Sequence, residues 1–176
     1  MRPGKKRRLL ILFFTVFLAW LAGLILLLIW FLKINLRLKK SNYEVNKVFH
    51  KLYLLDSSPG DEVIILGSDD PAWLGKAPYI KERVEFLINV SRRLGFLKES
   101  MFSVRIGVVE NISYYDALTE TSCIVINKNS INRNNEYLDN LLAHEFSHVI
   151  TWDEKDEHGK IWKKTYKILL ERLRKL

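Results

Sequence analysis

Three histidines and one glutamate near the C-terminus have the residue types and the spacing that chemistry requires. His144 and His148 are four residues apart, so a helix would place their imidazoles on one face, one turn apart, where they can share a metal ion. Glu145 stands between them, within reach of a water molecule on that metal. The spacing therefore predicts a metal site with a base beside it. The alternative is a chance match on an amphipathic helix, with histidines that belong to the core or the surface.

A third ligand is expected downstream, because catalytic zinc typically takes three protein ligands and leaves a fourth position to water. His158 is the only histidine after His148, and the charged residues before it predict a surface turn that lets the chain double back. Histidine is favoured because it is the commonest zinc ligand near neutral pH. Otherwise His158 would cap the final helix. Four acids in the turn are rival ligands: Asp153, Glu154, Asp156 and Glu157.

The pattern His-Glu-x-x-His is typical of zinc-dependent peptidases. Zn²⁺ would lower the pKa of a water molecule and polarise the scissile carbonyl, and Glu145 would pass the water's proton to the leaving amine. The apolar strand expected at 122–127 is either an edge for an extended peptide or a central strand without a free edge. An oxyanion donor is expected among four tyrosines that the sequence does not rank: Tyr114, Tyr115, Tyr137 and Tyr166.

The residues around the histidines resemble the SprT-like zinc metallopeptidases, in which His-Glu-x-x-His is followed by His-Gly-x-x-Trp or a close variant. The match rests on CIVIN at 123–127, on the helix end LLAHEFSHVITW and on HGKIWK at 158–163, and covers roughly residues 122–170. The resemblance implies an α+β, zincin-like domain with a small mixed sheet beside the active-site helix. It also implies that His158 is the third zinc ligand and that Trp162 packs beneath the site.

The net charge of +8 belongs to the N-terminal segment. Residues 1–40 hold nine of the 28 basic residues and no acid, which leaves 19 basic against 20 acidic residues in 41–176. A nucleic-acid partner is therefore not supported for the domain, and the expected partner is a protein or peptide substrate. After His158, seven basic residues face only Glu171, which favours a solvated helix face over a phosphate-binding strip.

Residues 9–32 form an apolar stretch without a charge, long enough to cross a bilayer as one helix. The stretch is too long for a secretory signal, and a buried globular helix is seldom apolar on all sides. We therefore expect a single-pass membrane protein. Lys and Arg number five before the stretch and four after it, up to residue 40, which favours a domain outside the cytoplasm by a small margin.

The apolar spacing predicts helices over 43–55, 79–94 and about 135–152, and from residue 160 onward. Strands are expected at 62–66, 103–109 and 122–127. Loops are expected at 56–60, 67–78 and 110–121 and between 127 and 135. Asp69 and Asp70 fall in the second loop, where a turn or helix-cap role is favoured over cation binding. Cys123 lies in an apolar run and is expected to be a buried thiol.

These observations predict four segments: a basic flank (1–8), a transmembrane helix (9–32), a juxtamembrane or stalk helix (33–55) and a zincin-like metallopeptidase domain (56–176). The predicted function is that of a membrane-anchored zinc-dependent endopeptidase with Zn²⁺ on His144, His148 and His158 and with Glu145 as general base. The alternative is a zinc-stabilised binding module that docks a partner at the membrane and does not cleave it.

Overall fold

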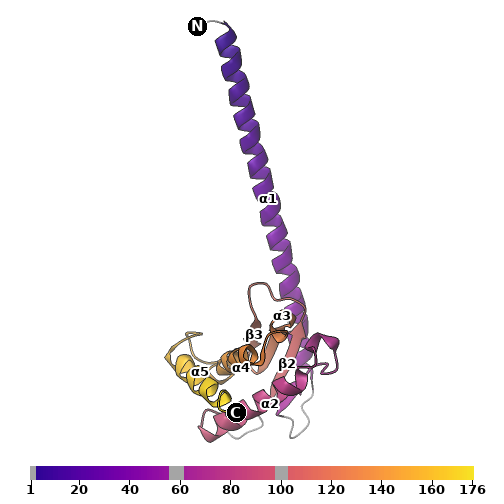
Figure 1. Cartoon of the computed structure of the whole chain (residues 1–176), viewed down its shortest axis with the longest axis vertical. Helices are drawn as coiled ribbons and strands as arrows, with labels where there is room; N and C mark the ends of the chain where they lie inside the picture. Colours follow the sequence, from indigo (N-terminus) through magenta and orange to yellow (C-terminus); the bar gives the residue numbers. More distant parts are fainter. Residues whose placement is uncertain (1–2, 56–61, 98–102) are drawn as a thin grey trace. The chain divides into compact units, whose positions relative to one another are not determined.

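The computed structural model describes residues 3–55, 62–97 and 103–176, apart from the side chains of residues 3–12. The loop expected at 56–60 and the side chains of the basic flank lie outside the described residues. The chain divides into two compact units, Met1–Lys40 and Ser41–Leu176, and each is described by itself (Figure 1).

Helix α1 (Pro3–Tyr53) contains both the apolar stretch and the helix expected at 43–55, as one continuous helix. In the first unit, the side chains from 13 to 33 are all exposed, although most of them are apolar. By length and composition, α1 is the one helix in the described part of the chain that is able to cross a membrane.

The second unit is built on a four-stranded mixed sheet in the order β1-β2-β4-β3. Strands β1, β2 and β4 are parallel, and β3 is antiparallel to β4. With helices packed against it, the sheet makes this unit α+β, as predicted. The three expected strands are all present, and the four are β1 (Val63–Ile65), β2 (Val104–Val109), β3 (Ala117–Glu120) and β4 (Cys123–Asn127).

One expectation about the sheet is wrong, and one open alternative is decided. The segment 110–121 is not entirely a loop, because Ala117–Glu120 form β3 along β4. Strand β4 is not an edge, because it pairs with β2 on one side and with β3 on the other. All five of its residues are buried, as a strand between two packed layers requires. In the described part of the chain, β3 is the outer strand on this side of the sheet.

The predicted helices are confirmed with small shifts at their ends. Helix α4, which carries the histidine motif, ends two residues earlier than expected, and α5 begins at Lys160 as predicted. The loop expected before α4 contains one short helical turn. The bounds are α2 (Ala77–Arg93), α3 (Lys128–Ile131), α4 (Asn135–Ile150) and α5 (Lys160–Leu173). Asp70 caps the 3₁₀ turn η1 (Pro71–Trp73), accepting a hydrogen bond from Ala72 N at 2.7 Å, which confirms a cap role for this acid.

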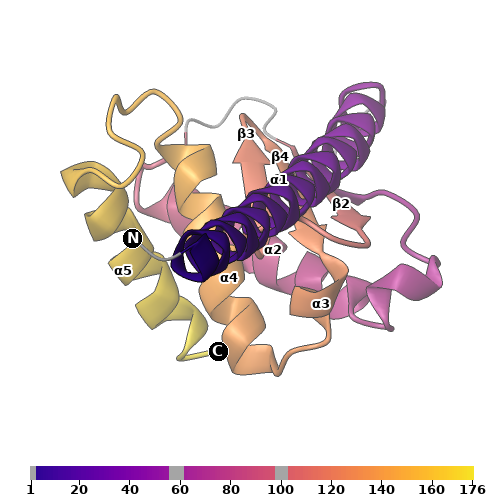
Figure 2. The ribbon, with the colours of Figure 1, turned by 90° about the horizontal axis from the view of Figure 1, so that it is seen from above.

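Helices α2, α4 and α5 pack on one face of the sheet, and Figure 2 shows α4 and α5 side by side. Their core includes Leu87, Leu142, Phe146 and Leu169, and it buries one face of each strand. The apolar stripe of α4 therefore does what its spacing predicts: it fixes the motif helix against the domain.

The last turns of α1 cover the other face of the sheet within the second unit. Val45, Phe49 and Leu52 are buried together with Cys123, so the thiol is a core group as expected. Gly107 allows this close approach, since a Cβ there would come within 2.5 Å of Val48 Cγ1. The sequence leaves the helix over 43–55 open between a stalk and a first helix of the domain, and its buried residues are those of a helix in the domain's core.

Candidate metal centre

The cap at the start of helix α4 and the buried face of the helix fix the orientation of the motif residues. The Asn134 side chain accepts a hydrogen bond from Tyr137 N at 2.8 Å and so caps the first turn. Phe146 and Val149 point into the core, whereas His144 and His148 lie half-buried on the flank of the same helix. Residues four apart share a face, so both imidazoles face the same side.

The third histidine is presented by the turn that precedes α5. The Glu154 carboxylate accepts hydrogen bonds from Ile161 N at 3.2 Å and Trp162 N at 2.9 Å, so it caps the first turn of α5. Gly159 makes room for this carboxylate, because a Cβ at that position would lie 2.1 Å from Glu154 Oε1. The cap and the glycine together fix the path of the chain at His158.

The three imidazoles converge on one point. His148 Nε2 lies 3.3 Å from His144 Nε2, and His158 Nε2 lies 3.4 Å from the same atom. One ligand atom from each ring lies within 4.8 Å of the other two. Two nitrogens on one zinc ion, each at about 2.0–2.1 Å with tetrahedral angles, lie about 3.3–3.4 Å apart. The spacing of the described nitrogens therefore fits a shared zinc ion.

Two aromatic side chains of α5 pack against the cluster. The Trp162 ring contacts all three imidazoles, with centroid distances of 4.8 Å to His144, 5.2 Å to His148 and 4.5 Å to His158. Tyr166 stacks on Trp162 and lies edge-on to His144 at 5.9 Å. Trp162 is buried, in the packing position that the resemblance implies.

The protein environment favours the neutral form of the two histidines on α4. Burial, aided by His148 and His158, lowers the pKa of His144 from 6.5 to about 4. Burial and the neighbouring His158 also lower the pKa of His148. A metal ion binds the neutral imidazole, so these directions favour metal binding at neutral pH.

Glu145 is 5% exposed, and its side chain is bound by a residue of the sheet. Thr119 Oγ1 on β3 donates a hydrogen bond to Glu145 Oε2 at 2.6 Å. Burial raises the pKa of the Glu145 carboxyl from 4.5 to about 7, while the bond from Thr119 acts in the opposite direction. A carboxyl that titrates near neutrality is suited to exchange protons with a substrate.

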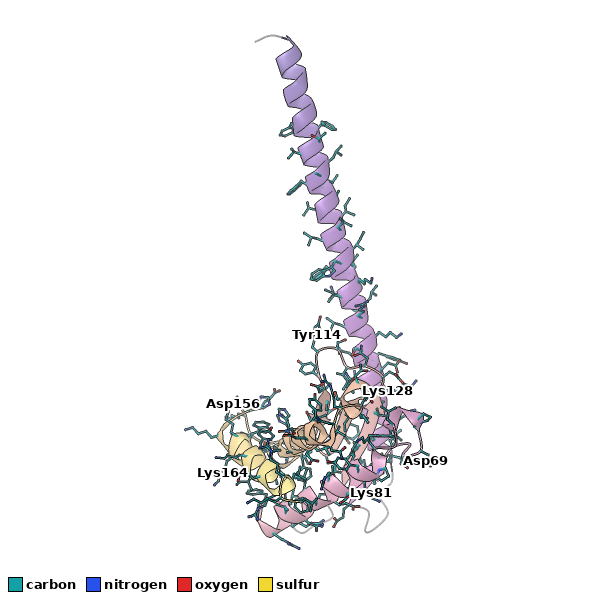
Figure 3. All side chains as sticks on the ribbon, viewed as in Figure 1. Asp69, Lys81, Tyr114, Lys128, Asp156 and Lys164 are labelled. Carbon is teal, nitrogen blue, oxygen red and sulfur yellow. The ribbon has the colours of Figure 1, made fainter. Side chains whose placement is uncertain are left out.

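The structure brings together the three predicted histidines and leaves the four rival acids out of the cluster. Among the described residues, the one group with metal-binding geometry is His144, His148 and His158. Glu154 is engaged at the start of α5 through both oxygens. Asp156, labelled in Figure 3, is exposed in the turn before α5.

The four candidate tyrosines differ in whether they contact the histidine cluster. Tyr166 is the one whose ring contacts His144, and Asn140 accepts a hydrogen bond from its hydroxyl at 3.4 Å. Tyr137 lies beside Asp116, and Tyr114 and Tyr115 are exposed on the loop between β2 and β3. Thr119 is the site residue that the sequence does not reveal, because it stands in a segment expected to be a loop.

Comparison with protein-family models, with curated proteins and with solved structures finds no match to this chain. The functional conclusion therefore rests on the motif and on the geometry of the second unit.

Proposed function

We propose that this chain is a membrane-anchored, zinc-dependent endopeptidase with a zincin-like domain of the SprT-like type. The observation that carries the proposal is the convergence of three imidazole nitrogens, two of them from the helix that also carries the buried Glu145. A metal centre with structural duties alone needs no such glutamate, and a chance motif would not bring His158 to the other two histidines.

The donor set fits zinc in number, chemistry and spacing. His144, His148 and His158 would supply three imidazole nitrogens, and the two separations measured from His144 Nε2 are those that a tetrahedral ion requires. Three protein ligands are the complement of a catalytic zinc site rather than of a closed structural one. When bound, zinc supplies a Lewis acid that activates water and polarises a carbonyl.

Glu145 would serve as the general base and then as the general acid. Thr119 occupies Oε2 of the carboxylate, so Oε1 is the oxygen left to take a proton from the attacking water. The same atom would return the proton to the leaving amine as the peptide bond breaks. Tyr166, at the side of His144, is the tyrosine best located to donate a hydrogen bond to the developing oxyanion, and its hydroxyl would then exchange its bond to Asn140 for this one.

The free side of β3 is the proposed binding edge for the substrate. An extended peptide can add to an exposed edge through main-chain hydrogen bonds, and in the described residues β3 pairs on one side only. Thr119 lies on this strand and touches the Glu145 carboxylate. A peptide bound along β3 would therefore pass the general base. The central strand β4 has no free edge to which a peptide could add.

The apolar part of α1 would anchor the protein as a single membrane span. Its exposed apolar side chains suit a lipid environment rather than water. The balance of basic residues favours a peptidase domain outside the cytoplasm. Protease accessibility of a tagged chain in intact cells tests this side: we expect digestion of the domain from outside, and full protection would contradict it.

The peptidase proposal is tested with full-length protein in detergent, an unstructured protein substrate and a Glu145→Gln variant. We expect the wild type to cleave the substrate and the variant to be slower by about 10²–10⁴-fold, the usual contribution of a general base. Zinc content should be the same in both, because Glu145 is not a ligand. If the variant cleaves as fast as the wild type, or if biological function survives without cleavage, the non-catalytic binding module replaces the peptidase.

A further inference from the structure

The loop between β2 and β3, residues 110–116, displays two neighbouring aromatic side chains to solvent. Tyr114 is 80% exposed and Tyr115 is 59% exposed. Neither lies in the proposed site, where Tyr166 is the tyrosine beside the histidines. We name this segment the tyrosine loop.

The tyrosine loop is held in place rather than free. The Asn127 side chain donates hydrogen bonds to Ile112 O at 3.3 Å and to Tyr115 O at 3.2 Å. Ile112, a residue of the loop itself, is buried in the core. Tyr114 adopts φ of +69°, a left-handed conformation that is uncommon for a non-glycine residue. The fold therefore keeps the two rings on the surface.

The loop surrounds the residue through which the chain enters the second unit. Ser41 is the first residue of that unit. Its Oγ donates a hydrogen bond to Asn111 O at 3.4 Å and accepts one from Ser113 N at 2.9 Å. Ser41 is 7% exposed, so these bonds are largely protected from water. The tyrosines thus stand beside the point where the domain is tethered to the rest of the chain.

We propose that the tyrosine loop is a second membrane contact, with Tyr114 and Tyr115 inserted in the headgroup region of the bilayer that α1 crosses. The inference rests on the anchoring part of the proposed function and is independent of the peptidase chemistry. Tyrosine is enriched at membrane interfaces because its ring is apolar and its hydroxyl is polar.

A short connection separates the apolar stretch from the second unit. Eight residues, 33–40, lie between Leu32, the end of the apolar stretch, and Ser41, and they span only about 13 Å as helix. A loop that hydrogen-bonds Ser41 is therefore held close to the surface of the bilayer.

The experiment measures the depth of spin labels on the full chain in vesicles of phosphatidylcholine and phosphatidylglycerol. Cys123→Ala removes the native thiol, and single labels are placed through Tyr114→Cys, Leu24→Cys and Lys81→Cys. Lys81 is exposed on α2, far from Tyr114 within the second unit (Figure 3). Each label's collision rate is measured with oxygen, which concentrates in lipid, and with a water-soluble nickel chelate.

We expect the label at position 114 to be several-fold less accessible to nickel than the label at 81, and the label at 24 to be protected. Adding Tyr115→Ser should raise nickel accessibility at 114, whereas Tyr53→Ser, a matched loss of an exposed tyrosine, should not. If the labels at 114 and 81 are equally accessible to nickel while the label at 24 is protected, the tyrosine loop does not contact the membrane. A protein partner then replaces lipid as the proposed contact of the loop. Nickel access at 24 overturns the anchor and this inference together.

Discussion

The hydrogen bond from Thr119 Oγ1 to Glu145 Oε2, at 2.6 Å, joins the outer strand of the sheet to the proposed general base. Glu145 is buried, so the carboxylate depends on this partner for its orientation and for part of its solvation. Hydrogen bonds to charged groups contribute about 1.5–3 kcal/mol. Thr119 is thus a positioning residue that acts through Glu145.

Replacing Thr119 by valine keeps the shape of the side chain and removes the donor. We expect kcat to fall about 10–100-fold, which corresponds to about 1.5–3 kcal/mol, with zinc content unchanged because no ligand is touched. Thr119→Ser should restore most of the rate, because it restores the hydroxyl. Steady-state kinetics and metal analysis on the three proteins would contradict this role if the serine variant were as slow as the valine variant.

The raised pKa of Glu145 predicts a pH-dependent loss of stability in zinc-free protein. The carboxyl ionises at 4.5 when unperturbed and at about 7 when buried, so between these values the folded state binds more protons than the unfolded state. The contribution of this carboxyl to the free energy of unfolding is therefore fully present below about pH 4.5. It is lost as the pH rises through 7, by about 3 kcal/mol in total.

Glu145→Gln removes this term, so the stability of the variant relative to the wild type should improve from about pH 4 to about pH 8. His144 and His148, whose lowered pKa values act in the opposite direction, are present in both proteins and cancel. Urea unfolding of chelator-treated chains measures the difference. A difference that stays constant over this range would contradict the burial of an ionisable Glu145.

At the scale of elements, the turn before α5 determines where His158 lies. The helix begins after Gly159, which has no side chain to cap it, and no acid stands in its first turn. Glu154 therefore supplies the acceptor from five residues upstream. A helix start with neither a capping side chain nor an acid is a sequence signal that one of the four acids serves as a cap rather than as a ligand.

Glu154→Ala should lower the thermal stability of zinc-free protein, by about 1–2 kcal/mol for a lost cap, and should weaken zinc binding by freeing the turn that holds His158. Glu157→Ala, an exposed acid of the same turn, is the matched control and should change neither. Unfolding curves without zinc separate the roles: a Glu154 that acted as a ligand would leave zinc-free stability unchanged.

Helices and parallel strands could be predicted because their apolar residues recur at a regular spacing. Strand β3 could not, because Ala117–Glu120 is short and contains residues such as alanine, leucine and glutamate that do not favour strands by themselves. It forms because β4 offers it a partner, and such pairing depends on tertiary contacts. The order of the strands has the same origin, so neither the central place of β4 nor the contact of Thr119 with Glu145 follows from local sequence.

At the scale of the whole molecule, the sequence separates a basic, apolar N-terminal segment from a nearly neutral domain, and the two compact units agree with that division. The boundary differs in detail, because the last turns of α1 are buried in the core of the second unit. The spacing of apolar residues at 45, 49 and 52 is that of a helix packed in a core, but a stalk helix shows the same spacing.

Leu21→Arg with Leu24→Arg should prevent stable membrane integration of the full chain. Each arginine near the centre of a span costs about 2.5–3.5 kcal/mol on insertion scales, and both leucines lie within the apolar stretch. Leu54→Arg adds charge at an exposed leucine just beyond α1 and should leave integration intact. Alkaline carbonate extraction measures the outcome, and retention of the double variant in the membrane pellet would contradict a spanning α1.

The zinc content of the purified full-length chain tests the metal centre most directly. Elemental mass spectrometry should find about one zinc ion per chain in the wild type and far less after His158→Ala. His50→Ala removes an exposed histidine of α1 and should leave the zinc content unchanged. A wild-type chain without zinc, or a His158→Ala chain that keeps its full complement, would contradict a centre formed by His144, His148 and His158.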